Sequence, residues 1–363
     1  MSPLVRRLEA DTRFEVCVCV TGQHRQMLDA ALAVFGVVPQ FDLDVMRLNQ
    51  QPTDVAAAVL AQLPRVIDEF QPDYVLVQGD TTTTMAAAIA AFYRRVPVGH
   101  IEAGLRTGDL SAPFPEEGNR CITTHIAALH FAPTQTSRRN LAAEGVSDSR
   151  IFVTGNTVID ALFLVRQRLL DDSAIAEQLD QRFEWLGFGR PMILVTGHRR
   201  ENFGQGFKNI CKALAQLARE FPVVKILYPV HLNPNVREPV FRLLGALENV
   251  RLIDPVDYVP FVYLMNRSHF IITDSGGVQE EAPSLGKPVL VMRDVTERPE
   301  AVEAGTVRLV GTDPGKIVLE ASRLLTDAAA YGEMSRVINP YGDGRACERI
   351  IEVLTRPTGA CVP

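Results

Sequence analysis

Short runs of apolar and β-branched residues recur along the whole chain, and most of them are continuous rather than alternating with polar residues. A continuous apolar run is typical of a strand that is buried on both faces of a parallel sheet. The pattern predicts strands at Glu15–Val20, Tyr74–Val77, Val96–Ile101, Leu129–Ala132, Ile151–Thr154, Met192–Thr196, Val224–Val230, Val250–Ile253, His269–Thr273, Pro288–Met292 and Val307–Val310.

Helical periodicity separates many of these predicted strands. Examples are Asp54–Phe70, Thr84–Arg94, Phe207–Glu220 and Gly315–Thr326. Strands that alternate with helices are typical of α/β units with right-handed crossovers. The sequence therefore predicts an α/β fold built on parallel sheets.

The chain length and one break in the pattern predict two domains. The chain has 363 residues, and one domain usually takes about 150. The break lies between Gly155 and Pro191, where a helix is followed by an acidic pair and a glycine-rich turn. We expect Rossmann-like, doubly wound domains at residues 1–155 and 156–345, facing each other across a cleft. The final segment, 346–363, contains a helix that could belong to either domain, the first included.

Composition and charge exclude several classes of protein. Lys and Arg total 37 against 43 Asp and Glu, so the net charge is −6 and a surface that coats nucleic acid is not expected. Long uncharged apolar stretches are missing from the sequence, which argues against a membrane span. None of the 6 cysteines forms a C-x-x-C pair, and the sequence starts without a secretory leader pattern. A cytoplasmic location follows as an expectation.

The most informative turn follows the predicted strand His269–Thr273. Ser275, Gly276 and Gly277 stand where a helix would begin, and the free N–H groups of a helix start favour an anion. Glu281, about one turn further, could accept hydrogen bonds from ribose hydroxyls. The competing interpretation is that Ser275 only caps the helix and that Glu280 and Glu281 complement its dipole. Neither G-x-G-x-x-G nor a P-loop motif is present, so redox cofactors and ATPase chemistry are not favoured.

Three carboxylates in the first half of the chain are candidates for proton transfer. Asp80 and Glu102 each follow a predicted strand, and Glu116 follows the rigid segment Pro113–Pro115. Carboxylates at the carboxyl ends of parallel strands lie where such folds bind ligands. An N-cap role for Asp80 and a solvated helix start for Glu116 and its neighbour Glu117 are the competing interpretations.

Histidines supply further candidates in similar positions. His198 lies in the run Gly197-His198-Arg199-Arg200 after a buried strand, which is a plausible clamp for an anion. His24 and His231 also follow predicted strands, but the residues beside them give less support for an anion-binding role. No spacing typical of metal ligands stands out, and no metal or other cofactor is expected.

Eight motifs run through nearly the whole chain. They are Gly22-Gln23-His24-Arg25-Gln26-Met27, Gly79-Asp80-Thr81-Thr82-Thr83-Thr84, Gly99-His100-Ile101-Glu102-Ala103-Gly104-Leu105-Arg106-Thr107, Pro115-Glu116-Glu117-Gly118-Asn119-Arg120, Gly197-His198-Arg199-Arg200-Glu201, Pro229-Val230-His231-Leu232-Asn233-Pro234, Asp274–Glu281 and Arg298-Pro299-Glu300. With these motifs the chain resembles the non-hydrolysing UDP-N-acetylglucosamine 2-epimerases of bacteria.

The resemblance implies a glycosyltransferase-B fold and an isomerase that interconverts UDP-GlcNAc and UDP-ManNAc without a metal or NAD. It also implies a homodimer whose product feeds the synthesis of cell-surface polysaccharide. In that family UDP leaves C1 as the C2 proton is removed, which gives 2-acetamidoglucal. UDP then adds back while a proton returns to the other face of C2.

The same resemblance assigns roles to individual residues. Asp80, Glu102 and Glu116 become the acid/base carboxylates, and His198 holds or protonates the diphosphate. Substrate contacts carry over to Phe261 near uracil, Ser275, Gly276 and Gly277 at the phosphates, Glu281 at the ribose, and Arg298. Val256 stands where the family often has Gln. A second UDP-GlcNAc acts as an activator in bacterial members, and its site matches Gln23, His24, Gln26, Arg200 and His231.

The N-terminus departs from the family pattern. Members begin with a strand and a Gly-Thr-Arg-Pro-Glu loop, whereas this chain starts inside the helix that contains Pro3, Leu4 and Val5. We therefore expect a form extended upstream to be more stable and more active than the 363-residue form.

Two alternative functions stay open: a glycosyltransferase of the same fold, and a catalytically impaired protein that binds UDP-sugars.

Overall fold

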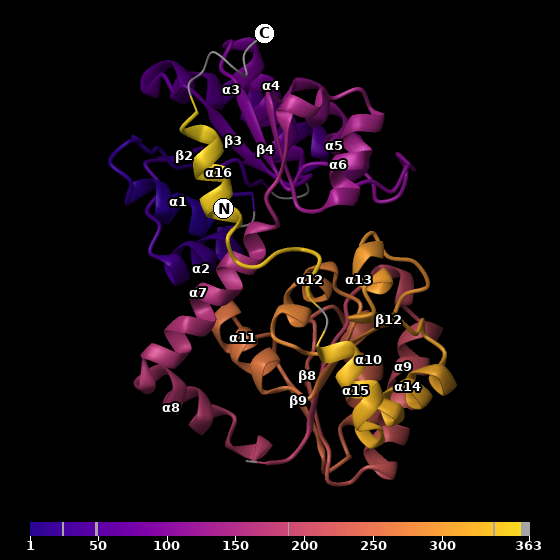
Figure 1. Ribbon diagram of the computed structural model, residues 1–363. Helices are drawn as coiled ribbons and strands as arrows, with labels where there is room; N and C mark the ends of the chain where they lie inside the picture. The colour runs from indigo at the N-terminus through magenta and orange to yellow at the C-terminus, as the bar shows by residue number, and fades with distance from the viewer. Residues whose placement is uncertain (24, 48–49, 188, 337, 357–363) are drawn as a thin grey trace. The chain divides into compact units, whose positions relative to one another are not determined.

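The structure is a computed structural model that describes residues 1–23, 25–47, 50–187, 189–336 and 338–356 (Figure 1). The chain divides into two compact units. Unit 1 contains Met1–Ala161 and the segment that starts at Tyr341, and unit 2 contains Leu162–Pro340. Unit 2 is thus one continuous segment inserted into unit 1.

Unit 1 is an α/β unit with parallel strands. Four strands form one sheet in the order β3, β4, β5, β6, with bounds Val75–Gln78, Val98–Ile101, Leu129–Ala132 and Ile151–Val153. Two short strands, β1 (Cys19–Val20) and β2 (Phe41–Asp42), pair with each other in a separate parallel ladder. The expected strand Glu15–Val20 is therefore wrong over residues 15–18, because the ladder between β1 and β2 contains only two residue pairs.

Helices of unit 1 pack around these two ladders. They are α1 (Ser2–Glu9), α2 (Arg25–Phe35), α3 (Pro52–Phe70), α4 (Thr82–Tyr93), α5 (Glu116–Ile126), α6 (Gln135–Ala143), the start of α7 (Thr157–Asp171) and α16 (Ala346–Leu354). Near the end of the chain, α16 packs on α1, and its residues Cys347 and Ile350 join a core with Leu4 and Phe131. The buried carboxylate of Asp160 accepts hydrogen bonds from the backbone N–H groups of the first two residues of α16.

Unit 2 is a second α/β unit on a six-stranded parallel sheet. The strand order is β12, β11, β10, β7, β8, β9, with bounds Val307–Leu309, Val289–Val291, Phe270–Thr273, Met192–Thr196, Lys225–Pro229 and Val250–Ile253. Its further helices are α8 (Ser173–Arg182), α9 (Gln205–Glu220), α10 (Pro234–Leu244), α11 (Tyr258–Arg267), α12 (Gly276–Ser284), α13 (Pro299–Glu303), α14 (Pro314–Thr326) and α15 (Ala328–Ser335).

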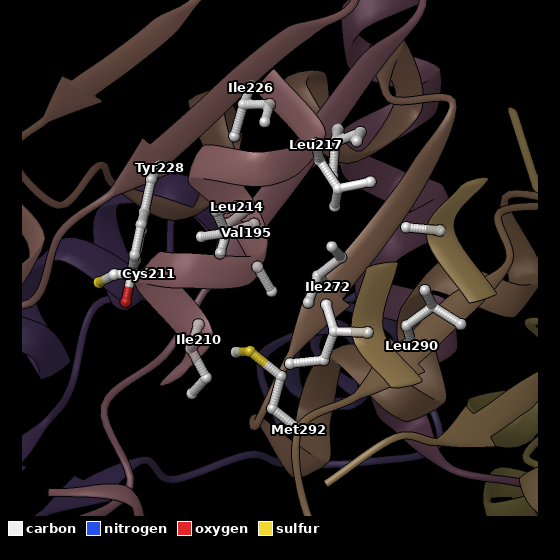
Figure 2. Close-up of a cluster of buried hydrophobic side chains, with 14 of the residues drawn as sticks. Val195, Ile210, Cys211, Leu214, Leu217, Ile226, Tyr228, Ile272, Leu290 and Met292 are labelled. Atoms are coloured by element: carbon white, nitrogen blue, oxygen red, sulfur yellow. The ribbon is translucent and has the colours of Figure 1, made fainter. Parts of the chain in front are cut away.

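The core of unit 2 lies between this sheet and α9. Leu214 and Leu217 of α9 meet Val195, Ile226 and Ile272, which point from three different strands (Figure 2). All five side chains are buried. Because side chains on one face of each strand are apolar and β-branched, they interdigitate with the apolar stripe of the helix. This packing fixes the strand ends that carry the polar residues described below.

The expected fold class, α/β with parallel sheets, is confirmed. Among the described residues, no helix combines the length and the apolar character that a membrane crossing requires.

Candidate functional site

Asp80 lies directly beyond the end of β3, where Gly79 takes a left-handed conformation with φ +75°. Its carboxylate Oδ2 lies 2.5 Å from Nη2 of Arg120, and its carbonyl accepts a hydrogen bond of 2.9 Å from the side chain of Asn119. The N-cap of α4 is Thr81, whose side chain accepts from the backbone N–H of Thr84. Asp80 is therefore not a helix cap, and its carboxylate is 28% exposed.

Glu102 follows the neighbouring strand, β4, in a strained conformation. Its φ is +64°, in the left-handed region that residues with a Cβ rarely adopt. Strain of this kind costs on the order of 1–3 kcal/mol and clusters at functional sites. One carboxylate oxygen is 3.4 Å from the amide nitrogen of Asn156, and the other faces Gly79. Glu102 thus lies next to the loop that carries Asp80.

Glu116 begins α5, the helix that also carries Asn119 and Arg120. Since both of those residues contact Asp80, the first turns of α5 lie against the end of β3. One carboxylate oxygen of Glu116, Oε2, is buried and has no hydrogen-bond partner. The interpretation of a solvated helix start does not hold for this oxygen, because it is shielded from water, although Glu116 as a whole is half-buried.

Glu117 is even more enclosed, with 1% of its side chain exposed. It contacts Arg120 at 2.8 Å, and its other oxygen accepts hydrogen bonds of 3.0 Å from the backbone N–H groups of Thr107 and Gly108. Burial acts to raise the pKa of Glu117, but the hydrogen bonds from Arg120 and the two backbone groups outweigh it, so the pKa is lowered. The sequence pattern did not predict this burial, because it depends on how the loop at Thr107 and Gly108 folds against α5.

In unit 2, the buried carboxylate of Asp274 organises the turn after β7. It accepts hydrogen bonds from the backbone N–H groups of His198 and Arg199 and from the side chain of Asn202. The ring of His198 remains 43% exposed, with Nδ1 3.4 Å from Asp274 and its face stacked on His231. Burial lowers the pKa of His198, although the charge of Asp274 opposes the shift.

The start of α12 carries the features expected of an anion site. Ser275 occupies the N-cap position, but its side chain does not cap the helix. A Cβ on Gly276 would lie 3.1 Å from the guanidinium of Arg298, so that side chain covers the helix start. Arg298 is held by Glu280 at 2.7 Å. A free helix N-terminus beside an arginine favours a phosphate group. Gly277 follows as an exposed helix residue.

Glu281, further along α12, is buried and receives a hydrogen bond of 2.6 Å from the hydroxyl of Tyr258. Burial raises the pKa of Glu281 to about 7, although the hydrogen bond from Tyr258 acts in the opposite direction. Tyr258 begins α11, and the half-buried Phe261 lies one turn further on. Val256 lies in the loop before that helix. No pattern in the sequence singled out Tyr258.

The residues expected at an activator site are spread over both units. In unit 1, Gln23 accepts a hydrogen bond of 2.9 Å from the hydroxyl of Thr83. In unit 2, Arg200 and His231 are exposed beside the turn that carries His198. His24 and the side chain of Gln26 lie outside the described residues. Across the described part of the chain, no group of His, Cys, Asp and Glu is arranged to hold a metal ion.

Comparisons with known proteins identify the family of the chain. A family profile described as UDP-N-acetylglucosamine 2-epimerase matches residues 6–355. A UDP-N-acetylglucosamine 2-epimerase of Yersinia pestis is 60% identical over 98% of this chain and 94% of its own length. One of Escherichia coli K12 is 59% identical with the same coverage.

Solved structures are similar as well. The UDP-GlcNAc 2-epimerase from Neisseria meningitidis bound to UDP-GlcNAc has a TM-score of 0.93 and 48% identity, covering 98% of this chain and 96% of that one. The enzyme from Methanocaldococcus jannaschii in complex with UDP-GlcNAc and UDP has a TM-score of 0.82 and 31% identity, with the same coverage.

Proposed function

The chain belongs to the UDP-N-acetylglucosamine 2-epimerase family, and on that premise we propose that it interconverts UDP-GlcNAc and UDP-ManNAc by inverting C2 of the sugar. The observation that carries the proposal is the set of three carboxylates, Asp80, Glu102 and Glu116, at the carboxyl end of the unit 1 sheet. In unit 2, the start of α12 with Arg298 supplies the complementary site for a diphosphate.

The reaction needs both acid/base carboxylates and a site that holds the departing diphosphate, because the C2 proton is not adjacent to a carbonyl group. In the proposed first step, a carboxylate takes the C2 proton, and the C–H electron pair forms a C1–C2 double bond. The C1–O electron pair leaves with UDP, giving 2-acetamidoglucal. In the second step a UDP oxygen adds back to C1 while a carboxyl group returns a proton to the opposite face of C2. Asp80, Glu102 and Glu116 are the proposed acid/base groups.

Unit 2 is proposed to bind the UDP portion. The N–H groups of Gly276 and Gly277 and the hydroxyl of Ser275, together with Arg298 and His198, would hold the diphosphate as its negative charge grows. Glu281 would accept the ribose hydroxyls. Phe261 would contact the uracil. The contact that Gln makes in other family members would either be lost at Val256 or be made by its backbone.

We also propose the remaining family properties for this chain. They are a cytoplasmic homodimer, a product used for cell-surface polysaccharide, and activation by a second UDP-GlcNAc at Gln23, His24, Gln26, Arg200 and His231. Light scattering would test the dimer, and the dependence of rate on UDP-GlcNAc concentration would test the activation.

An NMR assay of UDP-GlcNAc with the purified protein in D2O tests the central proposal. Elimination and re-addition must place deuterium at C2 of both epimers. Retention of the C2 proton in newly formed UDP-ManNAc would exclude this mechanism. Turnover only in the presence of a sugar acceptor would instead indicate a glycosyltransferase, and UDP binding without turnover would indicate a binding protein.

Replacing His198 by Ala is expected to weaken binding and catalysis together. A contact to the diphosphate acts in the ground state and strengthens as the leaving group gains charge. We expect UDP affinity to fall several-fold and kcat to fall by about 10²-fold, the scale of losing one donor to a developing oxyanion. Calorimetry with UDP and initial rates would measure the two effects. The exposed His125 on α5 offers a control, and unchanged affinity and rate in His198→Ala would remove His198 from the site.

The ribose contact predicts that affinity for UDP-GlcNAc depends on pH. Because Glu281 has a pKa of about 7 in the free protein and hydroxyls donate to the ionised form, affinity should rise as pH increases through 7. UDP-GlcNAc is a suitable probe because its diphosphodiester does not titrate in this range. Tyr258→Phe removes a hydrogen bond that lowers the pKa of Glu281, so the rise should move to higher pH. A pH-independent affinity between pH 6 and 8.5 would contradict the ribose role.

A further inference from the structure

Glu117 makes contacts that reach two other segments of the candidate site. Through Arg120 it reaches Asp80, since Nη1 of the guanidinium meets Glu117 at 2.8 Å and Nη2 meets Asp80 at 2.5 Å. Its second oxygen accepts the backbone N–H groups of Thr107 and Gly108, both at 3.0 Å. These two residues belong to the segment that leads from Glu102 to α5.

The enclosure of this network makes it rigid. Glu117 and Arg120 are 1% and 6% exposed, so water competes little for their hydrogen bonds. A charge-assisted contact with an arginine is short and directional. Asp80 is more open, at 28% exposed, so its free oxygen remains available while Arg120 holds the other one.

We propose that Glu117 is a positioning residue for C2 epimerisation, which holds Arg120 against Asp80 and anchors the segment between Glu102 and Glu116. The role rests on the proposed function and deepens it. One buried carboxylate then fixes the position of Asp80 and the path of the chain that connects the other two acid/base groups. Displacement of a reacting group by about 1 Å can cost about 10²-fold in rate, so this arrangement bears directly on kcat.

The main test is Glu117→Gln, which keeps the size of the side chain but turns an amide toward Arg120. We expect kcat to fall by about 10- to 100-fold with little change in KM, because the substrate contacts proposed for unit 2 are untouched. Calorimetry with UDP should give near wild-type affinity. Glu117→Asp, which keeps the charge but shortens the reach, should recover part of kcat.

Asp160→Asn provides the matched control for a merely structural role. Asp160 is also a buried carboxylate of unit 1, and it accepts two backbone N–H groups from α16, at 3.1 and 3.0 Å. Both variants are expected to lower the melting temperature. Only Glu117→Gln should lower kcat once rates are divided by the fraction of protein that binds UDP. An equal loss of kcat per binding-competent molecule in both variants would overturn the positioning role.

A double-mutant cycle tests whether Glu117 acts through Asp80. If it does, Asp80→Asn combined with Glu117→Gln should be little slower than Asp80→Asn alone. Losses that multiply would overturn the action through Asp80, and a normal kcat in Glu117→Gln would overturn the proposal as a whole. If Glu117→Gln does not fold, Glu117→Asp or Arg120→Lys replaces it in the double-mutant cycle with Asp80→Asn. If the wild-type protein incorporates no deuterium at C2, the proposed function is overturned together with the role of Glu117. If the wild-type protein incorporates deuterium and Glu117→Gln keeps a normal kcat, only the role of Glu117 is overturned.

Discussion

Asp80→Asn, Glu102→Gln and Glu116→Gln are each expected to lower kcat by at least ~10²-fold, the lower end of what general acid–base catalysis contributes. Each substitution keeps the size of the side chain and removes its capacity to exchange a proton. UDP affinity should change much less, because the proposed UDP contacts belong to unit 2. Initial rates of UDP-ManNAc formation and deuterium incorporation at C2 would measure the loss.

Asp148→Asn is the control for this series. Asp148 is an exposed carboxylate of unit 1 that pairs with Arg138 on the surface, and its loss should leave kcat unchanged. Any of the three site variants that retained near-normal turnover would be excluded from the chemistry. Loss of UDP binding in parallel with kcat would point instead to misfolding.

Glu102 allows a finer comparison, because its backbone is strained at φ +64°. Glu102→Ala and Glu102→Gly should be equally inactive. The glycine variant should be the more stable of the two by about 1 kcal/mol, since glycine adopts left-handed conformations without a Cβ clash. Chemical denaturation would measure this difference, and a more stable alanine variant would show that the backbone relaxes.

Acid is expected to destabilise the protein strongly through two histidines inside the unit 1 sheet. His100 and His130 face each other across β4 and β5, and both are fully buried. His100 contacts the carbonyl of Gly79 at 2.8 Å, whereas His130 has no hydrogen-bond partner of normal geometry. Burial lowers the pKa of His100 to about 4 and that of His130 to about 3.

The direction of the effect follows from these depressed values. Between about pH 6.5 and pH 4 the unfolded chain binds protons at both histidines while the folded protein does not, so acid favours unfolding. At pH 5 each histidine should lower the free energy of unfolding by on the order of 2 kcal/mol relative to pH 8. Both contributions are absent at and above neutral pH.

His130→Leu isolates this contribution. Denaturant unfolding at pH 8 and pH 5 should show a smaller loss of stability in the variant than in the wild type, by about 2 kcal/mol. The raised pKa of Glu281 acts in the opposite sense, since its folded form keeps a proton that the unfolded chain has lost. That contribution cancels when the variant is compared with the wild type. Identical pH dependence in the two proteins would contradict the buried, neutral state of His130.

The sequence predicted most of the strands, because strands that are buried on both faces consist of continuous apolar runs. Leu129–Ala132, Met192–Thr196 and Val250–Ile253 agree with the structure at both ends. The short strand Phe41–Asp42 was missed, because two residues give no periodic signal and the strand is defined only by its partner β1. The same short ladder limits β1 to Cys19–Val20.

The candidate site was predicted in part. The residues that follow strands, such as Asp80 and Glu102, could be selected because parallel strands bring their carboxyl ends to one edge. Glu117 and Tyr258 could not, because their importance depends on which side chains and loops they contact in the folded protein. Arg120 and Thr107 enclose the first, and Glu281 pairs with the second. A sequence pattern reports local periodicity, whereas such contacts exist only after folding.

The discontinuity of unit 1 has a consequence for synthesis on the ribosome. Its core near Leu4 and Phe131 includes Cys347 and Ile350 of α16, which are translated more than 180 residues after Ala161 leaves the unit. Unit 2, Leu162–Pro340, is one contiguous segment, and its core needs no residue from α16. Domains usually fold from the N-terminus onward during translation. In this chain, the apolar residues near Leu4 and Phe131 lack their α16 partners until the end of translation, so this part of unit 1 is completed last.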